Sequence, residues 1–411
     1  MMPESTRWTT RALRKYNRAA ALSRLYEQGS ASRQELAELT GLSSATVTNV
    51  VTELLADGLV VEAGSVSSAG GRPRGILRVG TENLRFAGVD IGETEIRVGL
   101  FDGALNPLAM TTRRPGTDLG PANVVALVTE AIAEVNAGTD GVPLLGVGVG
   151  VPGAVDERPG TETDDGLVYA PTLGWDAVPF GSMVAAGAHA PVHLENCARA
   201  LGQAEMWFGT GRGADRAVVT LLGIGVGAAL MTSDDSPRGG SGLTSEWGHT
   251  VVNLDGRPCR CGSSGCLEAY VGADAILARY LEQGGEAGPT AIGTQEDLRQ
   301  LLRRADTDDI ARSVVEETAK VLGVGVANLI NLLAPDRVVI AGWAGMVLGP
   351  TILPKVREVA RKHALPHAYA AVSIGLGESG ADGVARGAAS LPVLALLRSG
   401  SLPTEQSVEA G

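Results

Sequence analysis

The stretch FAGVDIGETEIRVGLFD, residues 86–102, has the pattern of a strand, a glycine turn and a second strand. Similar glycine-rich turns accompany buried apolar runs at 144–156, 217–231 and 338–345. Glycine lets backbone N–H groups approach an anion or a substrate closely. One such turn says little, because tight hairpins need glycine anyway. Four of them in a chain of alternating strands and helices predict an α/β architecture in which two halves close on a ligand.

The composition is that of a globular protein with several domains. A chain of 411 residues exceeds one ordinary domain, and 44% hydrophobic with 19% charged residues is typical of folded proteins. The sequence has no apolar run long enough to span a membrane, and its first residues lack the apolar segment of a signal peptide. We therefore expect a cytoplasmic protein of two or three domains without a membrane partner.

Residues 1–80 carry a basic charge that the rest of the chain does not share. Ten Lys and Arg against seven Asp and Glu give this segment a charge of +3, whereas the whole chain carries −12. A basic segment joined to an acidic body suits a DNA-binding module, although a solvated basic face would give the same count.

The pattern of residues 32–55 predicts a helix-turn-helix. Ser32 and Glu35 form a capping-box pattern at the start of a helix, and Gly41 ends that helix. In the next helix, which begins at residue 43 or 44, apolar residues recur on one face and polar residues occupy the other. The second helix of such a motif enters the major groove of DNA. On this polar face we predict DNA contacts from Ser44, Thr46, Thr48 and Asn49.

Two apolar runs, LVVEAG and ILRV, flank the sequence SVSSAGGRPRG after this helix. They predict two strands and a flexible loop, as in the wing of a winged helix. Arg72 and Arg74, near the tip of the loop, are expected to reach phosphates or a minor groove. The alternative is a small helical adaptor domain with a glycine-rich linker.

Several further motifs are those of a single family. They are DIGET at 90–94, GVGVPGAVD at 148–156, APTLGW at 170–175, ENCARALG at 195–202, SEWGH at 245–249 and CRCGSSGCLE at 259–268. With the winged helix, they make the chain resemble the ROK family of repressors and sugar kinases over nearly its whole length. The resemblance implies an actin-like ATPase (ribonuclease-H-like) body of two α/β lobes with a sugar between them. Kinases of this family generally lack the winged helix, whereas its transcription factors have it.

The expected fold is therefore α/β, with an N-terminal winged helix-turn-helix followed by two actin-like lobes. The predicted divisions are a DNA-binding domain at 1–80, a first lobe at 81–195, a second lobe at 196–397 and a disordered tail at 398–411. The last helices of the second lobe could return to the first.

Three of the four cysteines, Cys259, Cys261 and Cys266, are close together in the sequence. With His249 they make a Cys3His set, which is a common composition of a closed structural zinc site. Disulfides are rare in a reducing compartment, and four protein ligands leave no position for a catalytic water. We predict a structural zinc ion; a surface loop of free thiols is the alternative.

The family resemblance also implies a sugar site. Its E-x-G-H motif places a Glu and a His in the sugar pocket, and these are Glu246 and His249 here. Glu268 would accept hydrogen bonds from sugar hydroxyls, and Asn196 would both donate and accept them. For each, the alternative is an ordinary polar residue that pairs with backbone.

Cys197 stands where the family's kinases have the Asp that removes a proton from the sugar hydroxyl. A thiol with a pKa of about 8.5 is mostly protonated at neutral pH, so phosphoryl transfer should be lost. A small buried residue is favoured here over a reactive nucleophile. The nucleotide motifs differ too: Glu93 replaces a glycine, Ile224 replaces a threonine and Trp343 interrupts a glycine pair. We predict no catalytic residue and no ATP cofactor.

Together these patterns predict a sugar-responsive DNA-binding transcriptional regulator, which we expect to be a repressor and not an enzyme. Its partners would be double-stranded operator DNA in the bacterial nucleoid, a small sugar effector and further copies of the chain in a homodimer or homotetramer. One rival is a regulator whose pocket has lost sugars and responds to a protein partner, as Thr172 in place of the family's Asn suggests. The other is a bifunctional ATP-dependent sugar kinase with a DNA-binding arm.

Overall fold

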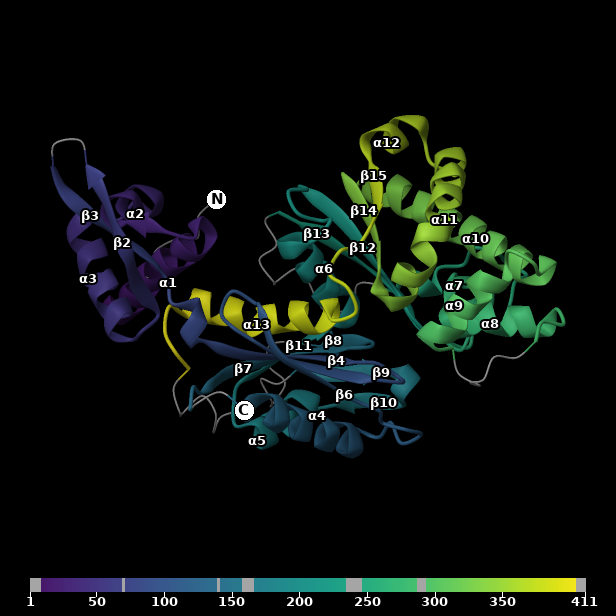
Figure 1. Cartoon of the computed structure of the whole chain (residues 1–411), viewed down its shortest axis with the longest axis horizontal. Coiled ribbons are helices and arrows are strands. Elements are labelled where there is room, and N and C mark those ends of the chain that lie inside the picture. Colours follow the sequence, from purple (N-terminus) through teal and green to yellow (C-terminus); the bar gives the residue numbers. More distant parts are fainter. Residues whose placement is uncertain are drawn as a thin grey trace.

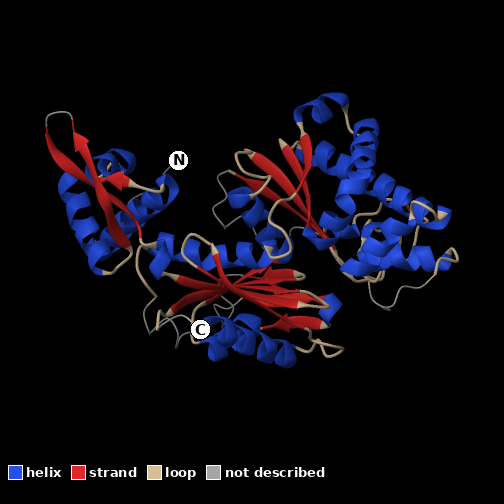
Figure 2. Ribbon diagram, viewed as in Figure 1, coloured by secondary structure: helices blue, strands red, loops and turns tan. Residues whose placement is uncertain are grey.

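A winged helix and two α/β lobes make up the protein (Figure 1). The computed structural model describes residues 9–68, 71–138, 141–156, 166–233, 246–286 and 293–403. Within those ranges, helices cover the sheets of both lobes (Figure 2). This is the α/β class, with an N-terminal winged helix and two lobes, that the sequence predicts. None of the helices in the described ranges is long and apolar enough to cross a membrane.

The winged helix has the helices and strands that its sequence pattern indicates. Ser32 caps the second helix: its hydroxyl accepts from the Glu35 N–H at 3.3 Å, while its own N–H donates to the Glu35 carboxylate at 2.7 Å. Gly41 then ends that helix with a φ of +70°. The elements are α1 (Thr10–Gln28), β1 (Ala31–Ser32), α2 (Arg33–Thr40), α3 (Ser44–Ala56), β2 (Val60–Ser68) and β3 (Gly71–Val79).

The wing differs from the prediction in one respect. The sequence predicts a long flexible loop, but β2 and β3 remain paired as far as Ser68 and Gly71. Arg72 and Arg74 therefore lie on strand β3 and not in a loop. Pro73 is tolerated there because β1 pairs with β3 only at Ile76 and Leu77, which leaves that edge of β3 open near the tip.

The first lobe is built on a five-stranded sheet of order β11-β7-β4-β5-β6. Strands β11, β7 and β4 run parallel to one another. Strand β5 pairs antiparallel with β4, and β6 pairs antiparallel with β5. The elements are β4 (Arg85–Ile91), β5 (Ile96–Phe101), β6 (Pro107–Arg113), α4 (Pro121–Asn136), β7 (Leu144–Val151), β8 (Ala154–Asp156), β9 (Leu167–Ala170), β10 (Trp175–Val178), α5 (Phe180–Ala188) and β11 (Val192–Asn196).

The second lobe is built on a four-stranded sheet of order β13-β12-β14-β15. It is buried on both faces: Val338 packs into one hydrophobic cluster and its neighbour Val339 into another, as alternate strand residues must. The elements are α6 (Cys197–Phe208), β12 (Arg216–Leu222), β13 (Val226–Thr232), α7 (Glu268–Val271), α8 (Ala273–Glu282), α9 (Gln295–Arg304), α10 (Asp309–Leu333), β14 (Arg337–Ala341), α11 (Gly342–His363), α12 (Pro366–Ala371) and β15 (Ser373–Leu376).

The last helix, α13 (Gly383–Ser399), leaves the second lobe and crosses the sheet of the first. It lies along β4 and β7 on the face opposite α4 and α5, and its far end reaches α1 (Figure 1). The helix includes Arg398 and Ser399, and Leu402 packs against the winged-helix core, so the first residues of the predicted tail are ordered. Residues 404–411 lie outside the described residues.

The winged helix and the body share one hydrophobic core. Leu22 and Leu25 of α1 belong to the same buried cluster as Phe86 of β4 and Val393 and Leu396 of α13. Burying each such side chain stabilises the fold by about 1.5–3 kcal/mol, so the contact favours a fixed orientation of the winged helix over a loose tether.

Candidate functional site

The four predicted metal ligands lie together. One ligand atom from each of His249, Cys259, Cys261 and Cys266 falls within 4.8 Å of all the others. The Cys259 Sγ is 3.6 Å from the His249 Nδ1, and the sulfurs of Cys261 and Cys266 are 3.8 Å apart. A tetrahedral zinc ion would separate a sulfur from a nitrogen by about 3.6 Å and two sulfurs by about 3.8 Å. The donor set and its spacing therefore fit zinc.

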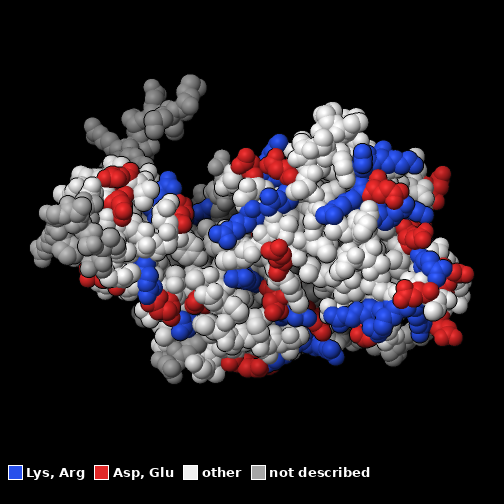
Figure 3. Space-filling model, turned by 45° about the horizontal axis from the view of Figure 1, so that its top comes forward, with Lys and Arg blue, Asp and Glu red and all other residues white. Residues whose placement is uncertain are grey.

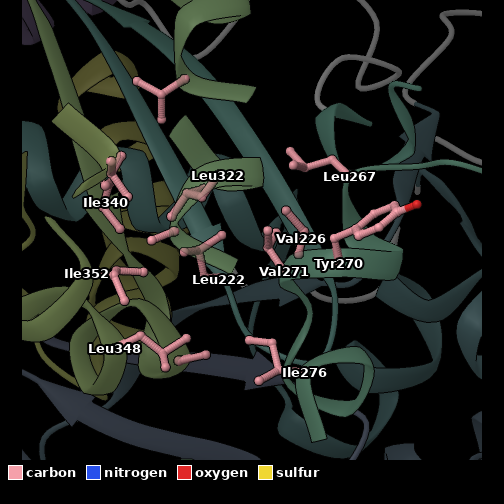
Figure 4. Packing of buried hydrophobic residues seen from close by; sticks show 14 of the residues in the cluster. Leu222, Val226, Leu267, Tyr270, Val271, Ile276, Leu322, Ile340, Leu348 and Ile352 are labelled. Carbon is pink, nitrogen blue, oxygen red and sulfur yellow. The ribbon is translucent and has the colours of Figure 1, made fainter. Parts of the chain in front are cut away.

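Backbone hydrogen bonds hold the cysteine loop in this shape. The Cys259 N–H donates to the Ser263 carbonyl at 2.8 Å, and the Gly265 N–H donates to the Arg257 carbonyl at 2.7 Å. Gly265 has a φ of +73°, and a Cβ there would lie 1.7 Å from the Asn253 carbonyl oxygen, so no other residue fits. Beyond the loop, Leu267 and Tyr270 lie in the hydrophobic core of the second lobe (Figure 4).

The two ring nitrogens of His249 face different groups. Its Nε2 is 3.7 Å from the Glu246 carboxylate, while its Nδ1 faces Cys259. The Glu246 side chain is largely exposed. One imidazole thus stands between the cysteine cluster and an acidic side chain that is open to a ligand.

Glu268 opens α7 and is almost wholly buried. One of its carboxylate oxygens accepts from the Val226 N–H at 2.9 Å, and the other accepts from the Arg260 Nε at 2.9 Å. A buried carboxylate needs such partners to offset its lost hydration.

Arg260, between two of the cysteines, connects the lobes and was not singled out from the sequence. Its Nη1 donates to both carboxylate oxygens of Glu93 at 2.8 Å. Glu93 lies in the turn between β4 and β5 of the first lobe, whereas the cysteine loop belongs to the second. The sequence did contain a signal for this contact: Glu93 is an acidic residue in a glycine turn, and an acid placed there requires a positively charged partner.

Asn196 and Cys197 lie where β11 passes into α6. The Asn196 amide donates to the Gly153 carbonyl at 2.7 Å, and its oxygen accepts from the Ala198 N–H at 2.8 Å as the helix cap. Among the described residues, these hydrogen bonds do not join Asn196 to Glu246, His249 or Glu268. Of the predicted sugar-binding residues, the described contacts join His249 to Glu246, whereas Asn196 contacts Gly153 and Ala198.

The Cys197 thiol is buried and donates to the Asp90 carboxylate at 3.7 Å. Burial, and then the charge of Asp90, raises the pKa of this thiol well above its usual value. Burial likewise raises the pKa of the Asp90 carboxyl to about 7. The thiol therefore favours its protonated form at neutral pH.

Side chains from elsewhere in the chain also lie against a second glycine turn. A Cβ on Gly223, in the turn between β12 and β13, would lie 3.1 Å from the Trp343 Nε1. A Cβ on Gly225 would lie 3.2 Å from the Arg260 Nη2. Trp343 and Arg260 therefore lie against this turn, opposite the turn that bears Glu93.

The predicted DNA-binding face lies on α3. Ser44, Thr48 and Asn49 are exposed and Thr46 is half-buried, while Val47, Val50, Val51 and Leu54 are buried on the opposite side. The side chains of Arg72 and Arg74 lie outside the described residues; only their strand positions are known. On the face seen in Figure 3, acidic and basic side chains are intermixed over the lobes, so the body offers no single basic surface there.

The fold and these motifs define a known class of protein: the chain belongs to the ROK family, which residues 86–393 match. Residues 16–62 match the MarR family. The chain is similar to the xylose repressor of Caldicellulosiruptor bescii, with 30% identity over 84% of this chain and 88% of that protein. It is also similar to the glucokinase of Thermotoga maritima, with 33% identity over 66% of this chain and 87% of that protein.

A solved structure shares the whole architecture. It is the crystal structure of a ROK family transcriptional regulator, a homologue of the E. coli MLC protein. The TM-score is 0.78 at 22% identity, and the match covers 97% of this chain and 99% of that one. The shared fold thus extends over the winged helix as well as both lobes.

Proposed function

We propose that this protein is a sugar-responsive transcriptional repressor with a catalytically silent kinase-like body. The observation that carries the proposal is the core that the winged helix shares with α13 of the body. Because this core is continuous, a displacement of α13 would be transmitted to the DNA-binding domain. The similarity to a xylose repressor over most of the chain supports the same function.

DNA binding is assigned to α3 and the wing. The exposed residues Ser44, Thr48 and Asn49, together with Thr46, would face the major groove. Arg72 and Arg74 on β3 would contact phosphates or the minor groove. A homodimer or homotetramer would place two such domains on a roughly palindromic operator.

The effector is assigned to the surroundings of the cysteine cluster. Zinc held by His249 and the three cysteines would fix the loop, and Glu246, His249 and Glu268 would bind sugar hydroxyls. Asn196 would join them from the first lobe through the hydrogen-bonding capacity that its amide retains. Zinc here supplies structure only, since four protein ligands leave no open position.

Catalysis is not expected from this body. The protonated Cys197 thiol offers no carboxylate to align and deprotonate a sugar hydroxyl. Glu93, Arg260 and Trp343 lie at the turns where the family resemblance places nucleotide phosphates. The bifunctional kinase stays a rival because of the similarity to a glucokinase, and measured ATP turnover would establish it.

Capture of sheared genomic DNA by the zinc-loaded protein tests the proposal, with and without D-xylose, D-glucose and N-acetylated sugars. We expect a few palindromic sites whose retention changes with one sugar. Specific sites that no sugar affects would favour the protein-partner rival. Retention without sequence preference would contradict the assignment of operator binding.

A further inference from the structure

Arg260 lies at the centre of an ion-pair chain that crosses from one lobe to the other. Its Nη1 contacts both oxygens of Glu93 at 2.8 Å, and its Nε contacts Glu268 at 2.9 Å. The exposed fractions of the three side chains are 34% for Arg260, 19% for Glu93 and 8% for Glu268. Such shielded, charge-assisted hydrogen bonds are stronger than surface ion pairs.

The guanidinium lies between two glycine turns from different lobes. Glu93 belongs to the turn after β4, and Gly225, whose Cβ would lie 3.2 Å from the Arg260 Nη2, belongs to the turn after β12. Backbone turns of this kind can bind an anion that bridges them. Here the Arg260 guanidinium, paired with Glu93, lies between the two turns.

We propose that Arg260 is a positioning residue that holds Glu268 for the effector and links it to Glu93 of the first lobe. The proposal rests on the sugar-responsive function above. A carboxylate has about four acceptor sites, and Val226 and Arg260 use two of those on Glu268, which leaves the others for sugar hydroxyls. A hydroxyl bound there shares its acceptor with Arg260, so the ion pair with Glu93 transmits sugar binding to the first lobe.

The loop geometry makes this link rigid. Arg260 is flanked by Cys259 and Cys261, two of the four clustered ligands, so its backbone cannot move independently of the cluster. Arg257 of the same loop provides a matched control, because it pairs instead with Glu282 of the second lobe at 2.7 Å and crosses no boundary.

The test uses the full-length zinc-loaded protein and the variants Arg260→Gln, Glu93→Gln, the double variant and Arg257→Gln. D-xylose and D-glucose affinities are measured by calorimetry, and operator affinity is measured with and without the sugar that binds. Arg260→Gln should weaken sugar binding by about tenfold or more, as expected for a lost charged hydrogen bond. Glu93→Gln should spare sugar affinity within about threefold but reduce the sugar-induced change in operator affinity. Arg257→Gln should change neither quantity.

Unchanged sugar affinity and unchanged operator response in Arg260→Gln would overturn the proposal. Urea unfolding without sugar tests the link between Arg260 and Glu93 independently of whether the protein is a sugar-responsive repressor. The effects of Glu93→Gln and Arg260→Gln on the unfolding equilibrium should be non-additive by a factor of about 3 or more, because the residues are in contact. Additive effects would refute the interlobe link even if the protein bound no sugar, whereas coupling without sugar binding would refute only the effector assignment.

Discussion

The Arg18 guanidinium in α1 donates a hydrogen bond to the Gly400 carbonyl at 2.8 Å, which ties the winged helix to the end of α13. The same side chain pairs with Glu53 at 3.1 Å and with Asp57, both at the end of α3. One buried arginine thus connects the predicted recognition helix to the helix that crosses the first lobe.

Replacing Arg18 by Ala should destabilise the protein and loosen the winged helix. The change leaves the Gly400 carbonyl and two carboxylates without their shared donor, so we expect the free energy of unfolding to fall by about 1–3 kcal/mol. Urea denaturation measures it. Arg24→Ala serves as the control because the exposed Arg24–Glu27 pair should contribute about 0–0.5 kcal/mol. Equal losses of stability in the two variants would show that the buried contacts of Arg18 contribute no more than an exposed ion pair.

Asn49→Ala should weaken specific operator binding without affecting folding. Asn49 is exposed on the polar face of α3, and a lost bidentate contact to a base costs about 1–3 kcal/mol. Fluorescence anisotropy with the captured operator measures this. Thr52→Ala, one turn further along the same face, is the control and should stay within about 0.5 kcal/mol. Unchanged affinity in the Asn49 variant would remove that residue from the set of base contacts.

Zinc binding should depend on the cysteines of the cluster and not on Cys197, which lies outside it. Cys261→Ser removes a ligand, so it should abolish stoichiometric zinc binding and lower the melting temperature. Cys197→Ser is the matched control, because Cys197 contacts Asp90 and lies outside the cluster. Elemental analysis and thermal unfolding with and without a chelator report the result. Full zinc occupancy in Cys261→Ser would contradict the four-ligand site.

Local patterns predicted the helix-turn-helix and the clustering of His249 with three cysteines, because those features depend on residues that are near in sequence. The capping box at Ser32 and the apolar face of α3 need only a short window of sequence. The two strands of the wing were predicted too short, and the loop between them too long, because Gly71 and Pro73 are typical of loops. An open strand edge tolerates both residues.

Long-range contacts could not be predicted in this way. Arg260 and Glu93 are 167 residues apart, and Arg18 and Gly400 are 382 residues apart. No periodicity relates such pairs; only the folded topology brings them together. Asn196 shows the same limit, because its motif indicated a ligand-binding amide while the structure also uses that amide to cap α6.

The stability of the protein should carry a pH dependence from Asp90. Burial raises the pKa of Asp90 to about 7; the charge of Arg97 lowers it and that of Asp382 raises it. The unfolded chain releases this proton at a pH of about 4, so between about pH 4 and 7 the folded state binds the extra proton and stability falls as pH rises.

Asp90→Asn removes that contribution, which is at most about 1.4 kcal/mol per pH unit. Relative to the variant, the wild type should therefore lose stability from pH 5 to pH 7. Urea denaturation of both proteins across this range measures the difference, and Asp176→Asn, an exposed substitution in the same lobe, should follow the wild type. Parallel curves for the wild type and Asp90→Asn would contradict the raised pKa.

Restoring an acid at position 197 should not restore a kinase. Cys197→Asp supplies the carboxylate that the family's kinases use, but the Glu93–Arg260 ion pair and the Trp343 indole still lie at the glycine turns. Phosphate binding would require Arg260 to leave two carboxylates, and Glu93 would then repel the anion. We expect ADP production with D-glucose or D-xylose to stay at background in a coupled assay, with a ROK glucokinase as the positive control. ATP-dependent turnover in the wild type would establish the bifunctional enzyme, and turnover only in Cys197→Asp would show that the nucleotide site is intact and that the base alone was lost.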